Sequence, residues 1–185
     1  LVFIFLLSLF LVIFVVSFGQ SLAFPPTGFT VKWFSKAVSM TMFRDAFVIS
    51  LLVGVFSTLT ALIFGIPAAY GLSRFSFRGR NAVELAFTSP VVIPALVIGF
   101  SLLRFLVIIG NIPVMLGLMI GHTVILFPYA VRVTGASLGN FDFLVEEAAI
   151  SLGASRWKSF FKVILPNIRT GILAAFILGF TLSFN

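Results

Sequence analysis

The sequence contains very little charge and no cysteine. Only 9% of its 185 residues are charged, 12 of them basic and 5 acidic, whereas an average soluble domain is about 25% charged. So few charged groups cannot cover a water-soluble surface, which excludes an ordinary soluble enzyme. The absence of cysteine excludes a disulfide scaffold and cysteine-ligated metal sites. A disordered chain is excluded as well, because disorder requires low hydrophobicity.

Hydrophobic residues make up 61% of the chain, and 25 of them are phenylalanine. They form long unbroken runs, whereas a transmembrane barrel would alternate apolar and polar residues. The composition therefore predicts an all-α integral membrane protein, a polytopic helical bundle. One span needs about 20 apolar residues, so the length allows five or six spans in a single domain. Because the chain begins with Leu1 and stops within an apolar run, we expect a fragment of a longer protein.

Five apolar segments are predicted to span the membrane, the last of them truncated: about 1–18, 46–72, 85–109, 114–133 and 170–185. The first could instead be the apolar region of a signal peptide, but no basic leader is visible. The 73–83 loop holds three basic residues and the 132–169 stretch holds five, while the opposite side holds three. The positive-inside rule places these two richer segments in the cytoplasm. The net charge of +7 is thus a mark of topology, and we expect no nucleic-acid partner.

The polar stretch 140–166, NFDFLVEEAAISLGASRWKSFFKVILP, predicts two short amphipathic helices. Asp142 can cap the first helix, and acidic residues follow near its positive N-terminal end. Gly153 is expected to stop this helix at a C′ position. One face of the first helix would carry the residues that recur every four positions: Leu144, Ala148 and Leu152.

The second helix of this stretch has its own start and stop signals. Ser155 can cap it, and Pro166 is expected to end it. Its apolar face would hold the residues at i, i+3, i+4 and i+7: Trp157, Phe160, Phe161 and Ile164. Such a pair of helices could lie on lipid or dock against a protein. The acidic first helix favours docking, since acidic groups avoid an anionic leaflet.

The order Glu147-Ala148-Ala149, three residues, Gly153, nine residues and Val163-Ile164-Leu165-Pro166 resembles the EAA loop of ABC importer permeases. The one departure is Val163 in place of isoleucine. The resemblance implies the type I (MetI-like) permease fold, with this loop forming a coupling helix that docks onto a cytoplasmic ATPase subunit. It assigns to that coupling role Glu146, Glu147, Ala148, Ala149, Gly153, Ala154, Leu165 and Pro166.

The same resemblance implies the partners and the cofactors. We expect a cytoplasmic ABC ATPase that holds ATP and Mg, a second permease subunit, an extracytoplasmic solute-binding protein, and the lipid of a bacterial cytoplasmic membrane. The chain itself has no Gly-rich P-loop with Lys and Ser/Thr. It is therefore expected to carry no cofactor, no metal and no catalytic residue, and to act as a transporter subunit without its own ATPase site.

Shorter motifs resemble the spermidine/putrescine branch of the family, so the expected solute is a polyamine. They are Gly28-Phe29 with Trp33, Phe75 to Arg80, Pro90 to Pro94, Pro128-Tyr129 and Phe180 to Ser183. These motifs recur in permeases for iron, thiamine, sulfate and phosphonates, so another solute is the alternative. An ion-coupled secondary transporter is a further alternative, but it would need acidic residues deep in the spans, and none is present.

Several residues in the predicted spans are candidates for the solute pathway or for hinges. Intramembrane ionisable and polar residues mark such sites, and prolines break helical hydrogen bonds; the second span is also expected to break near Gly65 and Pro67. The candidates are Pro90, Pro94, His122, Pro128, Thr181, Ser183 and Asn185. Gly171, Ala175 and Gly179 form a small-residue stripe that could pack within the subunit or against a second permease subunit.

Overall fold

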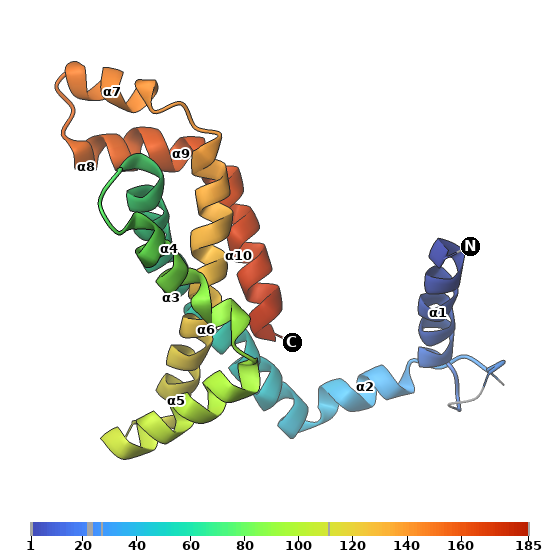
Figure 1. Ribbon diagram of the computed structural model, residues 1–185. Coiled ribbons are helices and arrows are strands. Elements are labelled where there is room, and N and C mark those ends of the chain that lie inside the picture. Colours follow the sequence, from blue (N-terminus) through green and yellow to red (C-terminus); the bar gives the residue numbers. More distant parts are fainter. Residues whose placement is uncertain (1, 22–23, 27, 111, 185) are drawn as a thin grey trace. The chain divides into compact units, whose positions relative to one another are not determined.

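The computed structural model describes residues 2–21, 24–26, 28–110 and 112–184, with the backbone alone at positions 2 and 95. Within these ranges the chain is helical, apart from loops and one isolated antiparallel bridge between Gly19 and Phe29 (Figure 1). The elements are α1 (Val2–Ser17), α2 (Lys32–Ser39), α3 (Thr41–Arg74), α4 (Arg80–Thr88), the 3₁₀ turn η1 (Ser89–Val92), α5 (Ala95–Ile109), α6 (Val114–Gly139), α7 (Leu144–Ser151), α8 (Arg156–Ser159), the π-turn η2 (Phe160–Ile164), α9 (Leu165–Asn167) and α10 (Arg169–Phe184).

The chain divides into two compact units, residues 1–49 and 50–185. In the first unit, α1 is an apolar helix whose exposed surface is largely Phe, Leu and Ile. After it the chain doubles back, with the Thr30 N–H donating to the Phe18 carbonyl over 2.7 Å. The Trp33 indole N–H donates to the Gly19 carbonyl over 3.1 Å. Helix α2 lies in the segment between the first two predicted spans.

In the 50–185 unit, α3, α6 and α10 form the bundle. Two described helices, Thr41–Arg74 and Val114–Gly139, are each long and apolar enough to cross a membrane. They contain the predicted spans 46–72 and 114–133 and run several residues past them. The predicted span 170–185 corresponds to α10, which covers Arg169–Phe184.

Proline breaks the chain at one predicted site and leaves it continuous at another. The segment expected as one span, 85–109, consists of α4 with η1 and then α5, and the two parts meet at a bend of 101°. Pro90 lies in η1, and Pro94 directly precedes α5. Because proline has no backbone N–H to donate, a helix that reaches it is interrupted. The break expected near Pro67 is wrong: α3 runs through it, as α6 runs through the buried Pro128.

The small-residue stripe of α10 packs inside the bundle. The buried residues of α10 are Gly171, Ala175, Gly179 and Ser183. A Cβ added at Gly171 would lie 1.7 Å from Ser137 Oγ on α6, and one at Gly179 would lie 2.9 Å from Thr58 Cγ2 on α3. Of the two packing alternatives for the stripe, the structure therefore shows contacts within the subunit, where absent side chains let the helices approach closely.

The polar stretch, called the 140–166 module below, forms one end of the 50–185 unit. It follows α6 and leads into α10, and Figure 1 shows α7 and α8 extending to one side from the ends of these two helices. A cluster of buried hydrophobic residues connects it to the bundle. The cluster contains Ala69 and Leu72 of α3, Val131 and Leu138 of α6, Phe160 and Ile164 of the module, and Ile168, which directly follows α9.

Candidate functional site

The first helix of the 140–166 module ends at the predicted residue and begins one residue later than predicted, with Phe143 at its N-cap. Asp142 Oδ1 accepts a hydrogen bond from the Leu144 N–H over 2.9 Å, which satisfies one free donor at the start of α7. Gly153 has a φ of 92°, a value that favours glycine. Its N–H donates to the Ile150 carbonyl over 2.9 Å, and the next N–H, that of Ala154, reaches the Ala149 carbonyl over 3.0 Å. This pair of bonds is a Schellman motif.

The second helix begins as predicted but ends later. Ser155 Oγ accepts from the Lys158 N–H over 3.3 Å, so Ser155 is the N-cap. Pro166 does not end the helix, which continues to Asn167, and the chain bends by 72° before α10. The π-turn Phe160–Ile164 ends two residues before Pro166, a residue that offers no N–H to the regular helical pattern.

The predicted four-residue apolar face of the second helix splits into two rows. Phe160 and Ile164 are buried in the bundle, whereas Trp157 and Phe161 are exposed and stack on each other with ring centroids 6.4 Å apart. Each pair is spaced i, i+4 and forms its own row. Only one row can face the core, so the predicted apolar face is divided between the core and the surface.

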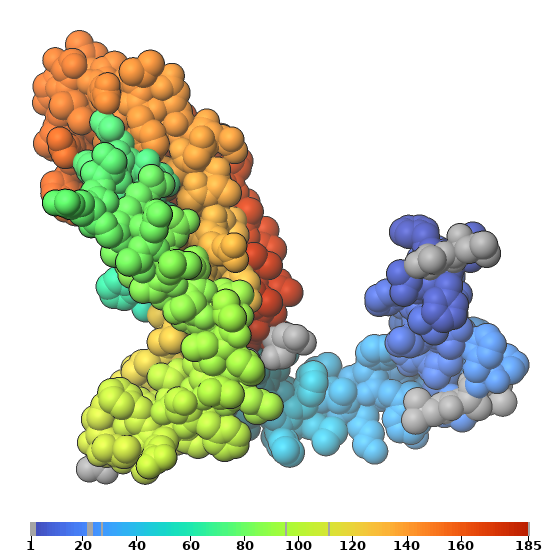
Figure 2. Space-filling model, in the orientation of Figure 1, coloured from blue at the N-terminus to red at the C-terminus, as the bar shows by residue number. Residues whose placement is uncertain are grey.

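The module therefore also has exposed apolar side chains on both of its helices, which we together call its outer face: Leu144, Ala148, Leu152, Trp157 and Phe161. All five are exposed, and Leu152 is 90% and Trp157 73% accessible. Figure 2 shows the module, in orange, at the free end of the 50–185 unit. The face predicted for the first helix exists, but it points to solvent in the isolated chain.

The two glutamates of the EAA sequence occupy different environments. Glu146 is 1% exposed, and the Glu147 side chain is 54% exposed. The Tyr70 hydroxyl donates to Glu146 Oε1 over 2.5 Å and Arg74 Nε donates to Glu146 Oε2 over 2.8 Å. Arg74 Nη2 also donates to Glu147 Oε1 over 2.9 Å. We call these four residues the clamp.

Sequence reasoning missed Tyr70 and Arg74. They lie one helical turn apart in the last part of α3 and so share a face, but 72 residues separate Arg74 from Glu146. No local spacing could have paired them. Aromatic rings enclose the clamp: Tyr70 lies 5.1 Å from the Phe160 ring, and the Arg74 guanidinium lies 5.4 Å from the Phe143 ring.

The other residues assigned to coupling surround the clamp and the turn. Ala149, Ala154 and Leu165 are half-buried, while Ala148, Gly153 and Pro166 are exposed. The module thus presents its alanines and its turn near the surface, while Glu146 holds its inner side.

A second group of polar side chains lies between the spanning helices. His122 Nδ1 on α6 and Ser183 Oγ on α10 share a hydrogen bond of 2.7 Å. Ser57 Oγ of α3 and Thr123 Oγ1 both donate to the Met119 carbonyl, over 3.2 and 2.7 Å. The structure thus brings together two of the pathway candidates, His122 and Ser183, in a seam of hydroxyl groups.

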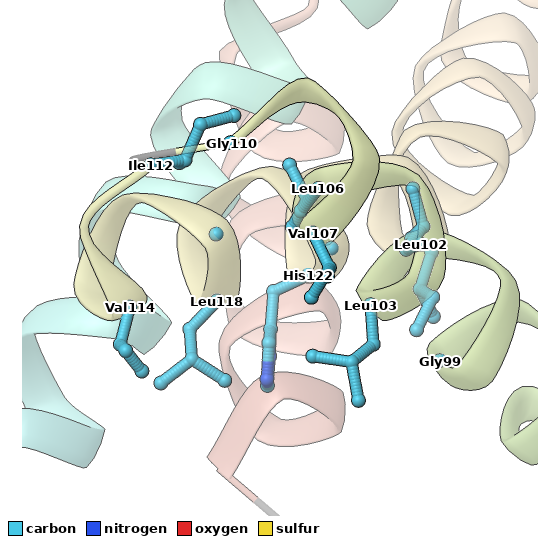
Figure 3. Close-up of a pocket in the computed structure, with 13 residues that line it drawn as sticks. Gly99, Leu102, Leu103, Leu106, Val107, Gly110, Ile112, Val114, Leu118 and His122 are labelled. Atoms are coloured by element: carbon cyan, nitrogen blue, oxygen red, sulfur yellow. The ribbon is translucent and has the colours of Figure 1, made fainter.

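His122 also lines a cavity of about 500 Å³ between α5 and α6. Figure 3 shows apolar side chains of both helices around it, with the His122 side chain between Leu118 and Leu103. The remaining candidates do not join this group: Thr181 is exposed and donates to the Ile177 carbonyl of its own helix. Asn185 lies outside the described residues. Among the residues described, no group of three or more His, Asp or Glu side chains could hold a metal ion.

Comparison with known proteins identifies the family. Residues 61–185 match the family described as "binding-protein-dependent transport system inner membrane component". The chain is 32% identical over 191 residues to the putrescine transport system permease protein PotI of Escherichia coli K12, covering 99% of this chain and 68% of that protein. It is 32% identical to the spermidine/putrescine permease PotC of the same strain, covering 85% of this chain and 60% of that protein.

Other relatives and the fold agree with this assignment. The molybdenum transport system permease protein ModB of Haemophilus influenzae is 36% identical over 73% of this chain and 65% of its own length. A crystal structure of a bacterial ABC transporter involved in the import of the acidic polysaccharide alginate matches the whole chain and 71% of its own, with a TM-score of 0.70 at 19% identity. The expected helical permease fold and inner-membrane location are confirmed: the chain belongs to the binding-protein-dependent transport system inner membrane components, the permease subunits of ABC importers.

Proposed function

We propose that this chain, within its complete permease subunit, lines half of a solute pathway and is driven by a separate cytoplasmic ATPase that docks on the 140–166 module. The observation that carries the proposal is the two-sided construction of the module. Its inner side is fixed to the bundle by the clamp and by Phe160 and Ile164, while its outer face is apolar and exposed.

The outer face has the character of a protein interface. An apolar patch of this kind, rimmed by polar residues, marks an interaction site. Aromatic residues are enriched at such sites, and Trp157 and Phe161 stack here over adjacent turns. The Gly153 turn keeps the end of α7 compact, so that a groove on a partner could receive it. Contact with lipid is the alternative. The half-exposed carboxylate of Glu147 disfavours it, because acidic groups avoid an anionic leaflet.

In this proposal the ATPase supplies the energy and the chain converts it into movement. ATP and Mg bind the partner subunit. A nucleotide shifts the permease between outward-open and inward-open states only if the docked ATPase binds the module differently in the two states. The second permease subunit completes the pathway, and an extracytoplasmic binding protein delivers the solute.

The solute is proposed to be a polyamine, because relatives named for putrescine and spermidine transport align with 85–99% of the chain. Relatives named for molybdenum transport make an oxyanion the second candidate. The hydroxyl and imidazole groups of the seam can accept hydrogen bonds from ammonium groups and also donate to oxyanions. The chemistry of the seam therefore does not choose between the two solutes.

Uptake measurements separate these solutes. Cells that lack the chromosomal gene would receive the complete subunit on a plasmid, and the uptake of labelled putrescine, spermidine and molybdate would be measured. We expect the plasmid to restore polyamine uptake, and unlabelled spermidine to compete with labelled putrescine. Restoration of molybdate uptake alone would reject the polyamine assignment while leaving the transporter assignment intact.

A further inference from the structure

The last turn of α3 is joined to α7 by the most buried charged group among the described residues. Tyr70 and Arg74 approach α7 from one face of α3, and both bond to the Glu146 carboxylate. The 140–166 module is continuous in sequence with α6 and α10 only. The clamp therefore adds a polar attachment to a third helix, which the chain does not provide by sequence.

The clamp fixes the position of α7 and also its rotation about its own axis. Glu146 and Glu147 project from α7 about 100° apart, because a helix has 3.6 residues per turn. A single guanidinium bonds to both carboxylates, through Nε and Nη2. Turning α7 about its own axis would break at least one of these bonds. A lysine could reach one carboxylate but lacks the planar fork that bonds to two.

Burial makes this attachment hard to open. Glu146 is 1% exposed and Arg74 26% exposed. Separating them would leave a carboxylate in a nearly water-free site, and an unpaired buried charge is strongly unfavourable. The rings of Phe143 and Phe160 exclude water on two sides. When the module moves, the end of α3 is therefore expected to move with it.

We propose that Tyr70 and Arg74 are positioning residues that transmit the displacement of α7 to α3 during transport. The inference rests on the proposed function, since it concerns how movement of the docked module reaches the spanning helices. It adds to that function two residues outside the EAA sequence and names the helix that they move.

The test uses the complete importer, purified and reconstituted with its ATPase, partner permease and binding protein. Arg74→Met removes the charge and Arg74→Lys keeps it, while Tyr70→Phe removes one hydroxyl. Arg78→Met is the matched control, because Arg78 lies in the next loop, is exposed and forms no ion pair within the described chain. The readouts are ATPase retention, solute moved per ATP hydrolysed, and the distance between spin labels at position 73 of α3 and position 151 of α7, which lie outside the clamp and the outer face.

We expect Arg74→Met to retain the bound ATPase but to lower the solute moved per ATP by about tenfold, within the usual range of coupling energies. Arg74→Lys should restore part of the loss, and Tyr70→Phe should lie between wild type and Arg74→Met. In the wild type the label distance should stay constant between nucleotide-free and ATP-bound states. In Arg74→Met it should broaden or change. These 185 residues contain no cysteine, so within them only the introduced positions are labelled.

Two results would overturn the inference. The first is that Arg74→Met moves as much solute per ATP hydrolysed as Arg78→Met does. The other is a wild-type label distance that changes between the states as much as in the variant. If Arg74→Met fails to insert, Tyr70→Phe and the wild-type labels decide. Loss of the ATPase from a Gly153 variant, with normal coupling in the clamp variants, would leave the proposed docking intact and remove only this inference.

Discussion

Arg74 at the end of α3 donates from Nε to Glu146 Oε2 over 2.8 Å, across 72 residues of sequence. This bond joins the last turn of a spanning helix to the acidic sequence that the EAA pattern places in a docking helix. It divides the two glutamates between an internal role and a surface role.

The division predicts unequal effects of removing the two carboxylates. Glu146→Ala leaves the Tyr70 hydroxyl without its acceptor and leaves Arg74 with Glu147 alone, so we expect a loss of about 1–3 kcal/mol in the free energy of unfolding. Glu147→Ala removes a half-exposed pair and should cost about 0–1 kcal/mol. Equilibrium unfolding of the complete subunit in mixed detergent measures both. Equal losses would contradict the separate environments of the two residues.

A side chain at Gly153 is expected to strain the backbone, although the residue is surrounded by open space. A Cβ added there meets no atom within 4 Å, and the same holds at Gly139. The two sites differ in φ, which is 92° at Gly153. Gly153→Ala should therefore destabilise the turn by about 1–2 kcal/mol, while Gly139→Ala, at the end of α6, should change stability little.

The same pair of variants also tests coupling, because Gly153 shapes the end of the outer face. We expect Gly153→Val, in the complete and inserted subunit, to lower both solute uptake and solute-stimulated ATPase activity. Gly139→Val serves as its control. Normal coupling in Gly153→Val would argue against docking at this turn.

The stability of the contact between α6 and α10 should depend on the small size of Gly171, which lies against Ser137. Gly171→Ala places a methyl group against Ser137, where an added Cβ lies 1.7 Å from Oγ, and is expected to cost about 1–3 kcal/mol by overpacking. Adding Ser137→Gly should recover part of this loss. Thermal denaturation of the single and double variants measures the recovery. Additive losses would show that the two positions do not meet.

The bond between His122 and Ser183 should contribute little to stability. Hydrogen bonds between spanning helices average about 0.6 kcal/mol in double-mutant cycles, and we expect a coupling energy of that size for His122→Ala with Ser183→Ala. If these residues line the pathway, each variant should also change the KM for uptake. Thr181→Ala is a control on the same helix, since its hydroxyl bonds only within α10. An unchanged KM would assign the bond to packing alone.

Features determined by neighbours in sequence could be predicted, and those determined by distant contacts could not. The capping of α7 and α8 and the glycine turn depend on side chains within a few residues of the backbone that they satisfy. Burial in the module depends on which row of the second helix meets α3 and α6, so the apolar pattern alone could not separate Trp157 and Phe161 from Phe160 and Ile164. The prolines show the same limit: a buried Pro128 is accommodated by its surroundings, while Pro90 and Pro94 lie at a true break.

The clamp is the clearest feature that could not be predicted from the sequence. Arg74 contributed to the charge count that set the topology, but its partners are on a helix far along the chain. The EAA resemblance identified Glu146 and Glu147 together, without indicating that one of them is buried. Only the packing of α7 against α3 separates their roles.

The most direct test of the account is site-specific photo-crosslinking at Leu152 in the assembled importer. Leu152 is 90% exposed on the outer face, and Leu173, which is 59% exposed on the spanning helix α10, is the control. We predict that a photoreactive residue at position 152 crosslinks the ATPase subunit, in a nucleotide-dependent yield, and that one at position 173 does not. A crosslink from position 152 to lipid, with none to the ATPase, would contradict the proposed docking of the 140–166 module.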